Sequence, residues 1–420
     1  MKSINKLTIS AIMAACAATS AYAVPATTKP IMVNQPDGTK IEVYLRGDER
    51  GSYFTTLDNV MISRGSNGCF YYTELGNDGK LVASSIRAHN EEERSFEEQA
   101  AVSMINGESL LGAFMQNRKL AASKAPSKTM DEGDLTKFPT IGSPRTVVIL
   151  CEYQDVKFTF TNEDYYDMMN KENYTNDFGA VGSSKDYYMS CSNGQFTPIF
   201  DVVGPVTLSK NRMYYGEHTS SQIDIRPKAM IKEAIQLADE ICDFSQYDYD
   251  GDGYVDNVFV YYAGVGEADS PVSEAIWPHK SELMTPVTCD GKKIVRYACH
   301  NELQYNEDEI PRMAGIGGFV HEFTHVLGLP DCYNTVNNDS FANPLTWDVM
   351  ASGNYNENSH RPPLFSVYQR YFCNWVQPIE LKTPTDVSMG YATDPESYDD
   401  VYILKTAKYK EYYLLANRQN

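Results

Sequence analysis

Residues 321–331 read HEFTHVLGLPD, and this stretch decides the fold class because it combines two histidines, a glutamate and a helix stop. His321 and His325 are one helical turn apart, so both imidazoles lie on one face of a helix and reach one ion. A catalytic zinc site takes three protein ligands and leaves the fourth position for water. Glu322 is then placed beside that water as a general base. The stretch therefore predicts a zinc-binding helix with hydrolytic chemistry.

The end of the stretch predicts that the chain turns back and supplies the third ligand. Gly328 can take the left-handed conformation that closes a helix, and Pro330 cannot continue one. Asp331 is the expected third ligand, with Asp339 and Asp348 as alternatives. A bare HExxH arises by chance in roughly one chain of this size per hundred, and the glycine and carboxylate lower that by about two orders of magnitude. A buried helix with two hydrogen-bonded histidines is the remaining alternative.

The wider sequence resembles two groups of metallopeptidases. HExxHxxGxxD followed by WDVMASG at 347–353 resembles the zinc motif and Met-turn of the metzincins, with Asp in place of the usual third His. Over about 140–380 the chain resembles the immune inhibitor A-type secreted metallopeptidases, at GSSKDYYMSCSNGQF (182–196), YDYDGDGYVDNV (247–258), IWPHK (276–280) and GFVHEFTHVLGLPDCY (318–333). The resemblance implies a metzincin-like zinc peptidase that acts on protein or peptide substrates. Met350 is then expected to be a packing residue under the zinc ligands. Tyr355 is a candidate donor to the oxyanion, and an ordinary surface tyrosine is the alternative.

The beginning of the chain predicts export. Residues 1–23 have a charged start, an apolar stretch and a small-residue end, which is the order of a secretory signal peptide, so the mature chain is expected to begin near Val24. Acylation at Cys16 after a lipoprotein-type cleavage is an alternative. No later segment is apolar for long enough to span a bilayer. The expected location is outside the cytoplasmic membrane, with the medium, the cell surface and the periplasm all open.

The composition limits the expected number of domains and the kinds of partner. With 420 residues, of which 42% are hydrophobic, we expect two or three domains. The net charge of −20 argues against a nucleic-acid partner, because phosphate binding needs a basic surface. The oligomeric state is not indicated.

Changes in pattern along the chain predict its organisation. Short strands and turns over 24–117 predict a β-rich domain, and its stretch at 36–49 resembles the pro-region of secreted bacterial proteases. Residues 118–138 are predicted as a linker for activation cleavage, 139–380 as the catalytic domain, and 381–420 as the start of a further β-rich region of a longer protein. A plain folding or binding module is the alternative for 24–117. Cys69 is a weak candidate for a zinc ligand in the latent form, because a lone cysteine in such a segment is more often structural.

The catalytic region predicts an α/β (α+β) core with helices packed on a mixed sheet. We expect buried strands at 145–153 and 258–262 and a last helix at 362–375. A helix that starts at Pro227 is expected to bury the stripe Met230, Ala234, Leu237 and Ile241. Residues 294–300 are the expected edge strand for an extended substrate.

The loop after that helix predicts a calcium site. Asp248, Asp250, Asp252 and Asp256 occupy positions 1, 3, 5 and 9 of a calcium loop. Phe259 stands where the loop's bidentate glutamate is expected, so a structural Ca²⁺ loop that leads into a strand is favoured over a helix-loop-helix hand. An Asp/Gly turn without an ion is the alternative.

Two other functions remain open at this stage. A secreted or surface binding protein could retain the fold and use the metal for stability alone, although a structural zinc site needs no base such as Glu322. Hydrolysis of another amide or an ester by the same zinc-bound water is the second alternative. His279 and His300 are candidates to line the site or to hold a second metal, but a lone histidine is more often structural.

Overall fold

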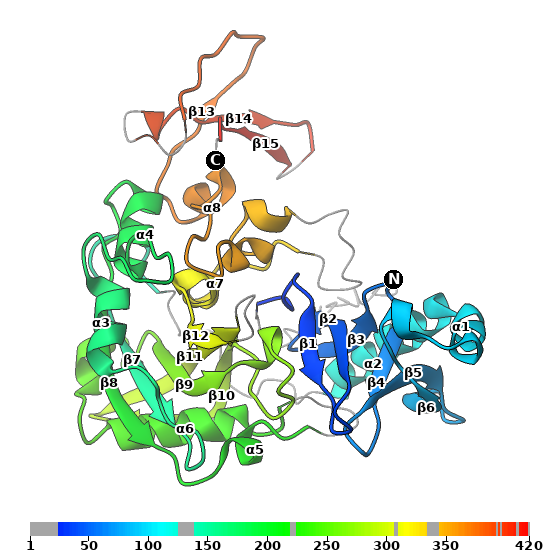
Figure 1. Cartoon of the computed structure of the whole chain (residues 1–420). Helices are drawn as coiled ribbons and strands as arrows, with labels where there is room; N and C mark the ends of the chain where they lie inside the picture. Colours follow the sequence, from blue (N-terminus) through cyan, green and yellow to red (C-terminus); the bar gives the residue numbers. More distant parts are fainter. Residues whose placement is uncertain are drawn as a thin grey trace, which may run out of the picture.

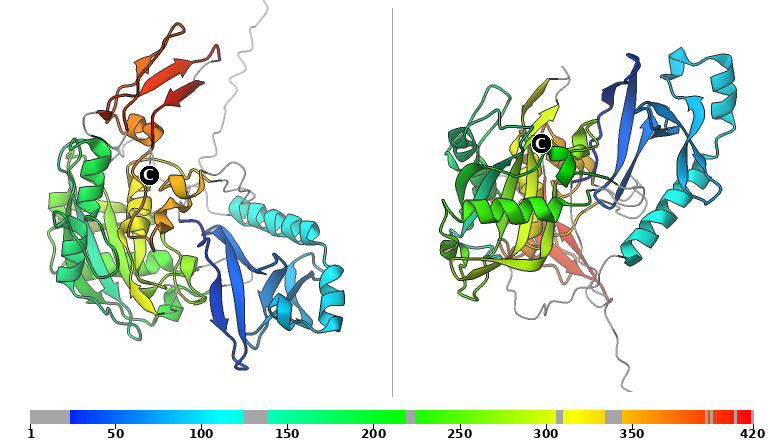
Figure 2. Two further views of the ribbon diagram at one scale, coloured as in Figure 1. Left: turned by 45° about the horizontal axis from the view of Figure 1, so that its top comes forward. Right: turned by 90° about the horizontal axis from the view of Figure 1, so that it is seen from below.

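The structure is a computed structural model that describes residues 24–124, 138–218, 224–305, 310–333, 344–391, 394, 397–408 and 411–418. It consists of an N-terminal part, a central part and a small C-terminal part, and the two outer parts contact different sides of the central one (Figures 1 and 2). The expected leader 1–23 lies outside the described residues. Within the described ranges, no helix has both the length and the apolar composition that crossing a membrane requires.

The N-terminal part is an antiparallel meander whose six strands pair in chain order. Its strands are β1 (Ile31–Asn34), β2 (Lys40–Asp48), β3 (Gly51–Thr56), β4 (Met61–Arg64), β5 (Phe70–Leu75) and β6 (Leu81–Arg87). Along β2, Ile41, Val43 and Leu45 are buried and alternate with more exposed positions, as expected for a sheet with one face on a core. The expected β-rich N-terminal region is confirmed.

Three helical elements follow the meander: η1 (Glu91–Glu93), α1 (Phe96–Ser103) and α2 (Gly107–Lys124). The side chain of Ser95 accepts a hydrogen bond from the Glu98 N–H and so caps α1. Residues 118–124 belong to α2, although the sequence analysis placed them in the linker. The remainder of that segment up to residue 137 lies outside the described residues.

The central part is built on a mixed five-stranded sheet in the order β10-β11-β9-β7-β8, with the short β12 paired to β11. Only β10 and β12 run antiparallel to their neighbours. The strands are β7 (Arg145–Glu152), β8 (Ile199–Thr207), β9 (Val258–Val265), β10 (His279–Cys289), β11 (Lys292–Tyr305) and β12 (Pro311–Met313). The expected edge strand 294–300 is therefore wrong, because β11 lies between β10 and β9.

Helices cover both faces of this sheet. The chain alternates along β7, so that Val148 and Leu150 pack into one core while Val147 and Ile149 pack into the other. The first core contains residues of α3 (Asn162–Asn170), α4 (Ser184–Ser192) and α7 (Ile316–Val326), and the second contains α6 (Pro227–Ala238) (Figure 1). The mixed α/β core is confirmed. Short elements complete it: α5 (Arg212–Tyr215), η2 (Phe244–Tyr247), η3 (Glu267–Asp269), η5 (Leu345–Trp347), η6 (Ser352–Tyr355) and α8 (Val367–Phe372).

Two helices differ from expectation. Helix α6 ends at Ala238, so Ile241 lies beyond it and is 56% exposed, whereas Met230 and Ala234 are buried as expected. Helix α8 is shorter than the expected 362–375, because Ser366 caps it and Asn374 has a φ of 62° just after it.

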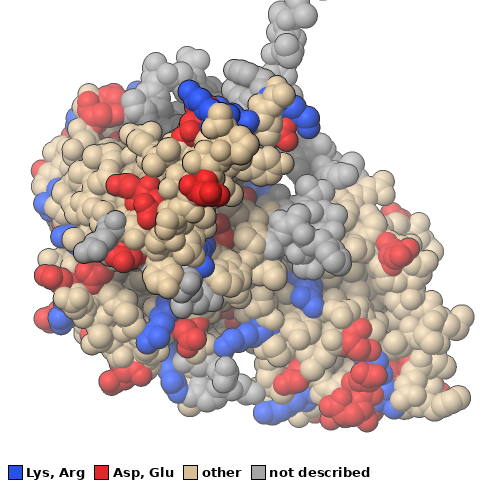
Figure 3. Space-filling view, turned by 90° about the horizontal axis from the view of Figure 1, so that it is seen from above, with Lys and Arg blue, Asp and Glu red and all other residues tan. Residues whose placement is uncertain are grey.

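The C-terminal part is a three-stranded sheet of β13 (Ile379–Glu380), β14 (Tyr402–Lys405) and β15 (Tyr412–Leu415). Figure 3 shows the molecule from above, and acidic and basic side chains are interspersed among the coloured residues of that face. Single-sign patches steer charged ligands over long distances. Among the coloured residues of this face, Figure 3 shows no large patch of a single charge sign.

Candidate metal centre

Helix α7 carries the candidate metal centre and packs very closely against its neighbours. A Cβ atom on Gly317 would lie 1.9 Å from the backbone oxygen of Asn354, and one on Gly318 would lie 1.8 Å from Nε2 of His300. Only glycine permits such approaches. The two glycines therefore seat α7 directly against η6 and β11.

The chain reverses directly after this helix. Gly328 has a φ of 98°, in the left-handed region that glycine favours, and its N–H donates to the carbonyl of His325 at 3.0 Å. The reversal brings Asp331 back over the helix.

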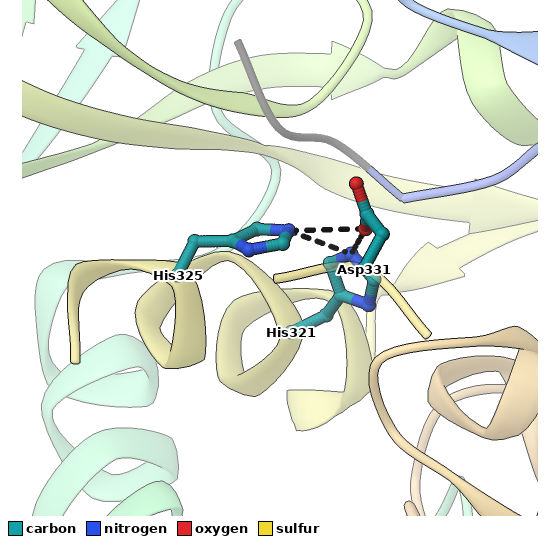
Figure 4. Close-up of side chains that lie close together, drawn as sticks. All are labelled: His321, His325 and Asp331. Atoms are coloured by element: carbon teal, nitrogen blue, oxygen red, sulfur yellow. Dashed lines mark hydrogen bonds and ion pairs between the residues drawn. The ribbon is translucent and has the colours of Figure 1, made fainter. Parts of the chain in front are cut away.

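Three donor atoms converge at this point, and Figure 4 shows their side chains pointing toward one another. Nε2 of His321 and Nε2 of His325 are 3.2 Å apart. Oδ1 of Asp331 lies 3.3 Å from Nε2 of His321 and 3.2 Å from Nε2 of His325. Ligands around a tetrahedral Zn²⁺ ion are separated by about 3.3 Å, given metal–ligand distances of about 2.0–2.2 Å. The spacing fits a zinc ion.

The tautomers of the two imidazoles also fit a metal. Nδ1 of His321 donates to the carbonyl of Val349 at 2.7 Å, and Nδ1 of His325 donates to the carbonyl of Leu329 at 2.8 Å. In a neutral ring, the opposite nitrogen then presents a lone pair. The two lone pairs are 3.2 Å apart and lie beside the buried carboxylate of Asp331. Neither oxygen of that carboxylate has a hydrogen bond among the described residues. These groups repel one another unless a cation lies between them.

Glu322 is fully buried beside these ligands. Its Oε1 accepts a hydrogen bond of 2.9 Å from the backbone N of Val24, and its Oε2 has no hydrogen-bond partner among the described residues. Burial raises the pKa of Glu322 well above its ordinary value; the Val24 N–H opposes this rise, and the charges of Asp331 and Glu49 add to it. The N-terminal part of the chain therefore contacts the candidate general base. In Figure 4, the blue ribbon of the first described residues passes above Asp331.

The other predicted residues take distinct positions around the centre. Tyr355 donates from its hydroxyl to the carbonyl of Pro25 at 2.7 Å. Met350 is buried in the core next to Val349, which holds His321. Asp348 accepts hydrogen bonds at its Oδ1 from the Met350 N–H at 2.8 Å and from Gln369 at 2.7 Å, and so stabilises the turn. It is not part of the cluster of ligand atoms, which consists of His321, His325 and Asp331. Asp339 lies outside the described residues.

The predicted calcium loop brings three of its four aspartates together. Ligand atoms of Asp248, Asp250 and Asp252 lie within 4.8 Å of one another. Asp256 accepts from the Tyr249 N–H at 2.8 Å and so closes the loop. Nζ of Lys292 lies 2.6 Å from Asp248 Oδ2 and offsets part of the negative charge.

The two further candidate histidines differ in their surroundings. His279 is hydrogen-bonded on both ring nitrogens, to the carbonyl of Trp277 at 2.7 Å and to the hydroxyl of Tyr297 at 2.8 Å, as a structural histidine is. The ring of His300 packs against Gly318, and burial lowers its pKa to about 4.

One cluster was missed by the sequence analysis. His218 lies 3.4 Å from Glu267 and 3.7 Å from Asp224, and Asp224 also accepts from the Trp277 N–H at 2.8 Å. Burial lowers the pKa of His218, but the two carboxylates raise it to about 10. The ligand atoms of these three residues lie within 4.8 Å of one another. His218 and Asp224 lie between α5 and α6 and Glu267 lies in η3, and no regular spacing in the sequence reveals the cluster.

The fold and the arrangement of the site residues agree with the class of metallopeptidases. Residues 140–376 match the family model described as immune inhibitor A peptidase M6, catalytic domain, and the chain belongs to that family. It is 29% identical over 245 residues to "Pre-pro-metalloprotease PrtV" of Vibrio cholerae serotype O1 (strain M66-2), covering 52% of this chain and 25% of the relative. It is 25% identical over 312 residues to "Immune inhibitor A" of Bacillus thuringiensis subsp. alesti, and this match covers 63% of this chain and 44% of the relative. The matches thus span less than half the length of these relatives.

Proposed function

We propose that this protein is a secreted zinc-dependent endopeptidase made as a latent zymogen. The observation that carries the proposal is the convergence of His321, His325 and Asp331, with Glu322 buried beside them. The proposed ligands are two neutral imidazoles and one carboxylate, a donor set that suits Zn²⁺ and leaves a fourth position.

The residues around that position have the roles that peptide hydrolysis needs. A bound zinc ion supplies a water of lowered pKa and polarises the substrate carbonyl. Glu322 accepts the proton of the attacking water and passes it to the leaving amine. Tyr355, whose hydroxyl here donates to the carbonyl of Pro25, donates to the oxyanion when a substrate carbonyl takes that place.

Latency and secretion belong to the same proposal. The leader-like sequence at 1–23 supports export, and the first described residue, Val24, contacts Glu322. The donor Tyr355 is also occupied by this N-terminal segment. The zymogen is therefore expected to gain activity when the N-terminal part leaves the site after cleavage in the linker. The aspartate loop is proposed to hold a structural Ca²⁺ ion.

The rival proposal is a secreted binding protein that keeps the metal for stability alone. A closed structural site needs no base, whereas Glu322 is a buried carboxylate at this site, and one of its oxygens has no hydrogen-bond partner among the described residues. Burying such a group without a function lowers stability, because an unpaired buried carboxylate is unfavourable. The geometry favours catalysis.

The test compares hydrolysis of casein by linker-cleaved protein with and without a chelator. Glu322→Ala should lower the rate by about 10²–10⁴-fold, because general base catalysis contributes that much. Glu163→Ala, at an exposed position in α3, is the matched control and should retain full activity. Equal turnover in all samples would contradict the proposed zinc hydrolase.

A further inference from the structure

A second group of metal-binding side chains lies outside the centre on α7 and consists of His218, Asp224 and Glu267, here called the His218 cluster. Its ligand atoms lie within 4.8 Å of one another. Nε2 of His218 is 3.4 Å from Oε2 of Glu267 and 3.7 Å from Oδ1 of Asp224. Ligands around a four-coordinate Zn²⁺ ion are separated by about 3.3 Å, given metal–ligand distances of about 2.0–2.2 Å. The two measured distances are close to that value.

The ligand atoms of the cluster are buried and lack hydrogen bonds. Asp224 is 9% exposed and Glu267 is 6% exposed. Nε2 of His218, Oδ1 of Asp224 and Oε2 of Glu267 have no hydrogen-bond partner among the described residues. A buried carboxylate oxygen without a partner is unfavourable. Two such oxygens and one ring nitrogen therefore face a common point that a cation would fill.

Backbone contacts on both sides hold the cluster in place. In the segment before α6, the N–H of Ile225 donates to the carbonyl of Glu217 at 2.9 Å and so keeps the adjoining cluster residues close together. A Cβ atom on Gly216 would lie 2.3 Å from the backbone oxygen of Glu274, so this segment packs directly against the stretch after η3. The main chain therefore builds the geometry of the cluster.

The two carboxylates are also oriented by their surroundings. Oδ2 of Asp224 accepts a hydrogen bond from the Trp277 N–H at 2.8 Å, which leaves Oδ1 for the cluster. The backbone N–H of Glu267 donates to the carbonyl of Ile276 at 3.2 Å and fixes the start of η3. Hydrogen bonds of this kind orient carboxylates that ligate metals.

A protonated His218 is the alternative partner for the two carboxylates. Burial lowers the pKa of His218, but the carboxylates raise it to about 10. Its Nε2, however, lies 3.4 Å and 3.7 Å from the two oxygens, beyond the range of about 2.7–3.2 Å for an N–H···O bond. One imidazolium also leaves one of two buried negative charges unbalanced, whereas a divalent ion beside a neutral imidazole balances both. Distance and charge thus favour an ion.

We propose that His218, Asp224 and Glu267 bind a second Zn²⁺ ion, separate from the ion of the centre on α7. The imidazole favours Zn²⁺ over Ca²⁺ and Mg²⁺, which prefer oxygen ligands. The side chain of His218 is 26% exposed, so the ion has access from solvent and water can complete its coordination. The inference goes beyond the proposed function, because this site contains none of the residues that carry it.

The ion lies beside the surface that receives the N-terminal part. The carbonyl of Ala268 in η3 accepts from the Thr27 N–H at 2.9 Å. Trp277, whose N–H is bonded to Asp224, donates from its indole Nε1 to the carbonyl of Val24 at 2.9 Å. The second ion therefore braces this surface from within the central part, and binding it should stabilise the folded chain.

The test uses the full chain with His321→Ala and Asp331→Ala, which together remove the centre on α7, and with Ca²⁺ present to fill the aspartate loop. Equilibrium dialysis and metal analysis measure Zn²⁺ binding. This chain should bind one Zn²⁺ ion, and Zn²⁺ should raise its melting temperature. Adding His218→Ala or Glu267→Gln should weaken binding by at least about 10–100-fold, the range seen when only a supporting group is lost, and should abolish the rise.

His89→Ala in the same chain is the matched control, because His89 also lies beside a carboxylate, 3.0 Å from Glu98, but outside the cluster. It should leave the Zn²⁺ affinity and the rise unchanged. Equal binding in the His218→Ala, Glu267→Gln and His89→Ala chains, all folded by circular dichroism, would overturn the second site, and so would a failure of the starting chain to bind Zn²⁺. Neither result bears on the centre on α7, which casein hydrolysis by the parent chain tests separately.

Discussion

Asp331 is the residue that turns a pair of histidines into a three-donor site. Its Oδ1 lies 3.2–3.3 Å from both Nε2 atoms, and neither of its buried oxygens has a hydrogen bond among the described residues. Asp348, the alternative ligand, is already satisfied by the Met350 N–H and by Gln369. A carboxylate with no other partner is the one available to a cation.

Replacing these two aspartates should therefore have different effects on metal binding. Asp331→Ala should weaken Zn²⁺ binding by at least about 10–100-fold, the range seen when only a supporting group is lost. Asp348→Asn keeps an oxygen acceptor and should leave affinity nearly unchanged while lowering thermal stability. Chelator competition and thermal unfolding measure the two effects. A larger loss of affinity in Asp348→Asn would mean that the third ligand is misassigned.

Single residues also show how far the sequence could predict this site. His321 and His325 lie on one face of a helix because helical spacing is local, so their convergence follows from a four-residue interval. The contact between Val24 and Glu322 spans 298 positions and has no local signal. Such contacts depend on how separate sheets dock, and single-sequence patterns do not encode that.

At the scale of elements, the position of α7 depends on contacts that only glycine allows. A Cβ atom on Gly317 would meet the Asn354 oxygen of η6 at 1.9 Å. Gly112, in the exposed interior of α2, has nothing within 4 Å of its Cβ position. The two glycines are chemically identical but differ in their surroundings.

The same substitution should therefore have opposite effects at these two positions. Gly317→Ala should destabilise the protein by about 1–3 kcal/mol through overpacking, and should weaken Zn²⁺ binding because α7 must shift. Gly112→Ala should stabilise α2 by up to about 1 kcal/mol, because alanine favours helix more than glycine does. Melting temperatures and chelator competition test both. A destabilised Gly112→Ala together with an unaffected Gly317→Ala would contradict this account of the packing.

The aspartate loop before β9 should respond to Ca²⁺ as an element. The carboxylates of Asp248, Asp250 and Asp252 repel one another, and Lys292 offsets only part of their charge. Ca²⁺ should therefore raise the melting temperature of the parent protein, because an ion that binds only the folded state stabilises it. In the doubly substituted Asp250→Asn, Asp252→Asn protein this rise should be largely lost, whereas Asp243→Asn, outside the cluster, should retain it. An equal rise in all three proteins would place the Ca²⁺ elsewhere.

At the scale of the whole molecule, the N-terminal and central parts share one core. Trp277 and Ala268 of the central part belong to the same buried cluster as Ile41 and Val43 of the meander. The indole Nε1 of Trp277 donates to the carbonyl of Val24 at 2.9 Å. The sequence predicted both parts, because strand and helix patterns are local, but it gave no signal for the surface that joins them. Shape complementarity between two folded parts is not a periodic property of the chain.

This shared core predicts that activity will appear only after a delay once the linker is cut. Protein cleaved between 125 and 137 should still elute as one species, since buried apolar contacts and the Trp277 hydrogen bond hold the parts together. Trp277→Phe removes one hydrogen bond, worth about 1 kcal/mol, and should speed release of the N-terminal part by roughly fivefold, with earlier casein hydrolysis. Trp347→Phe changes a residue that is 47% exposed, and it should not speed the release of the N-terminal part. Immediate separation of cleaved parent protein on gel filtration would show that the linker alone maintains latency, and the docking surface would then have no part in it.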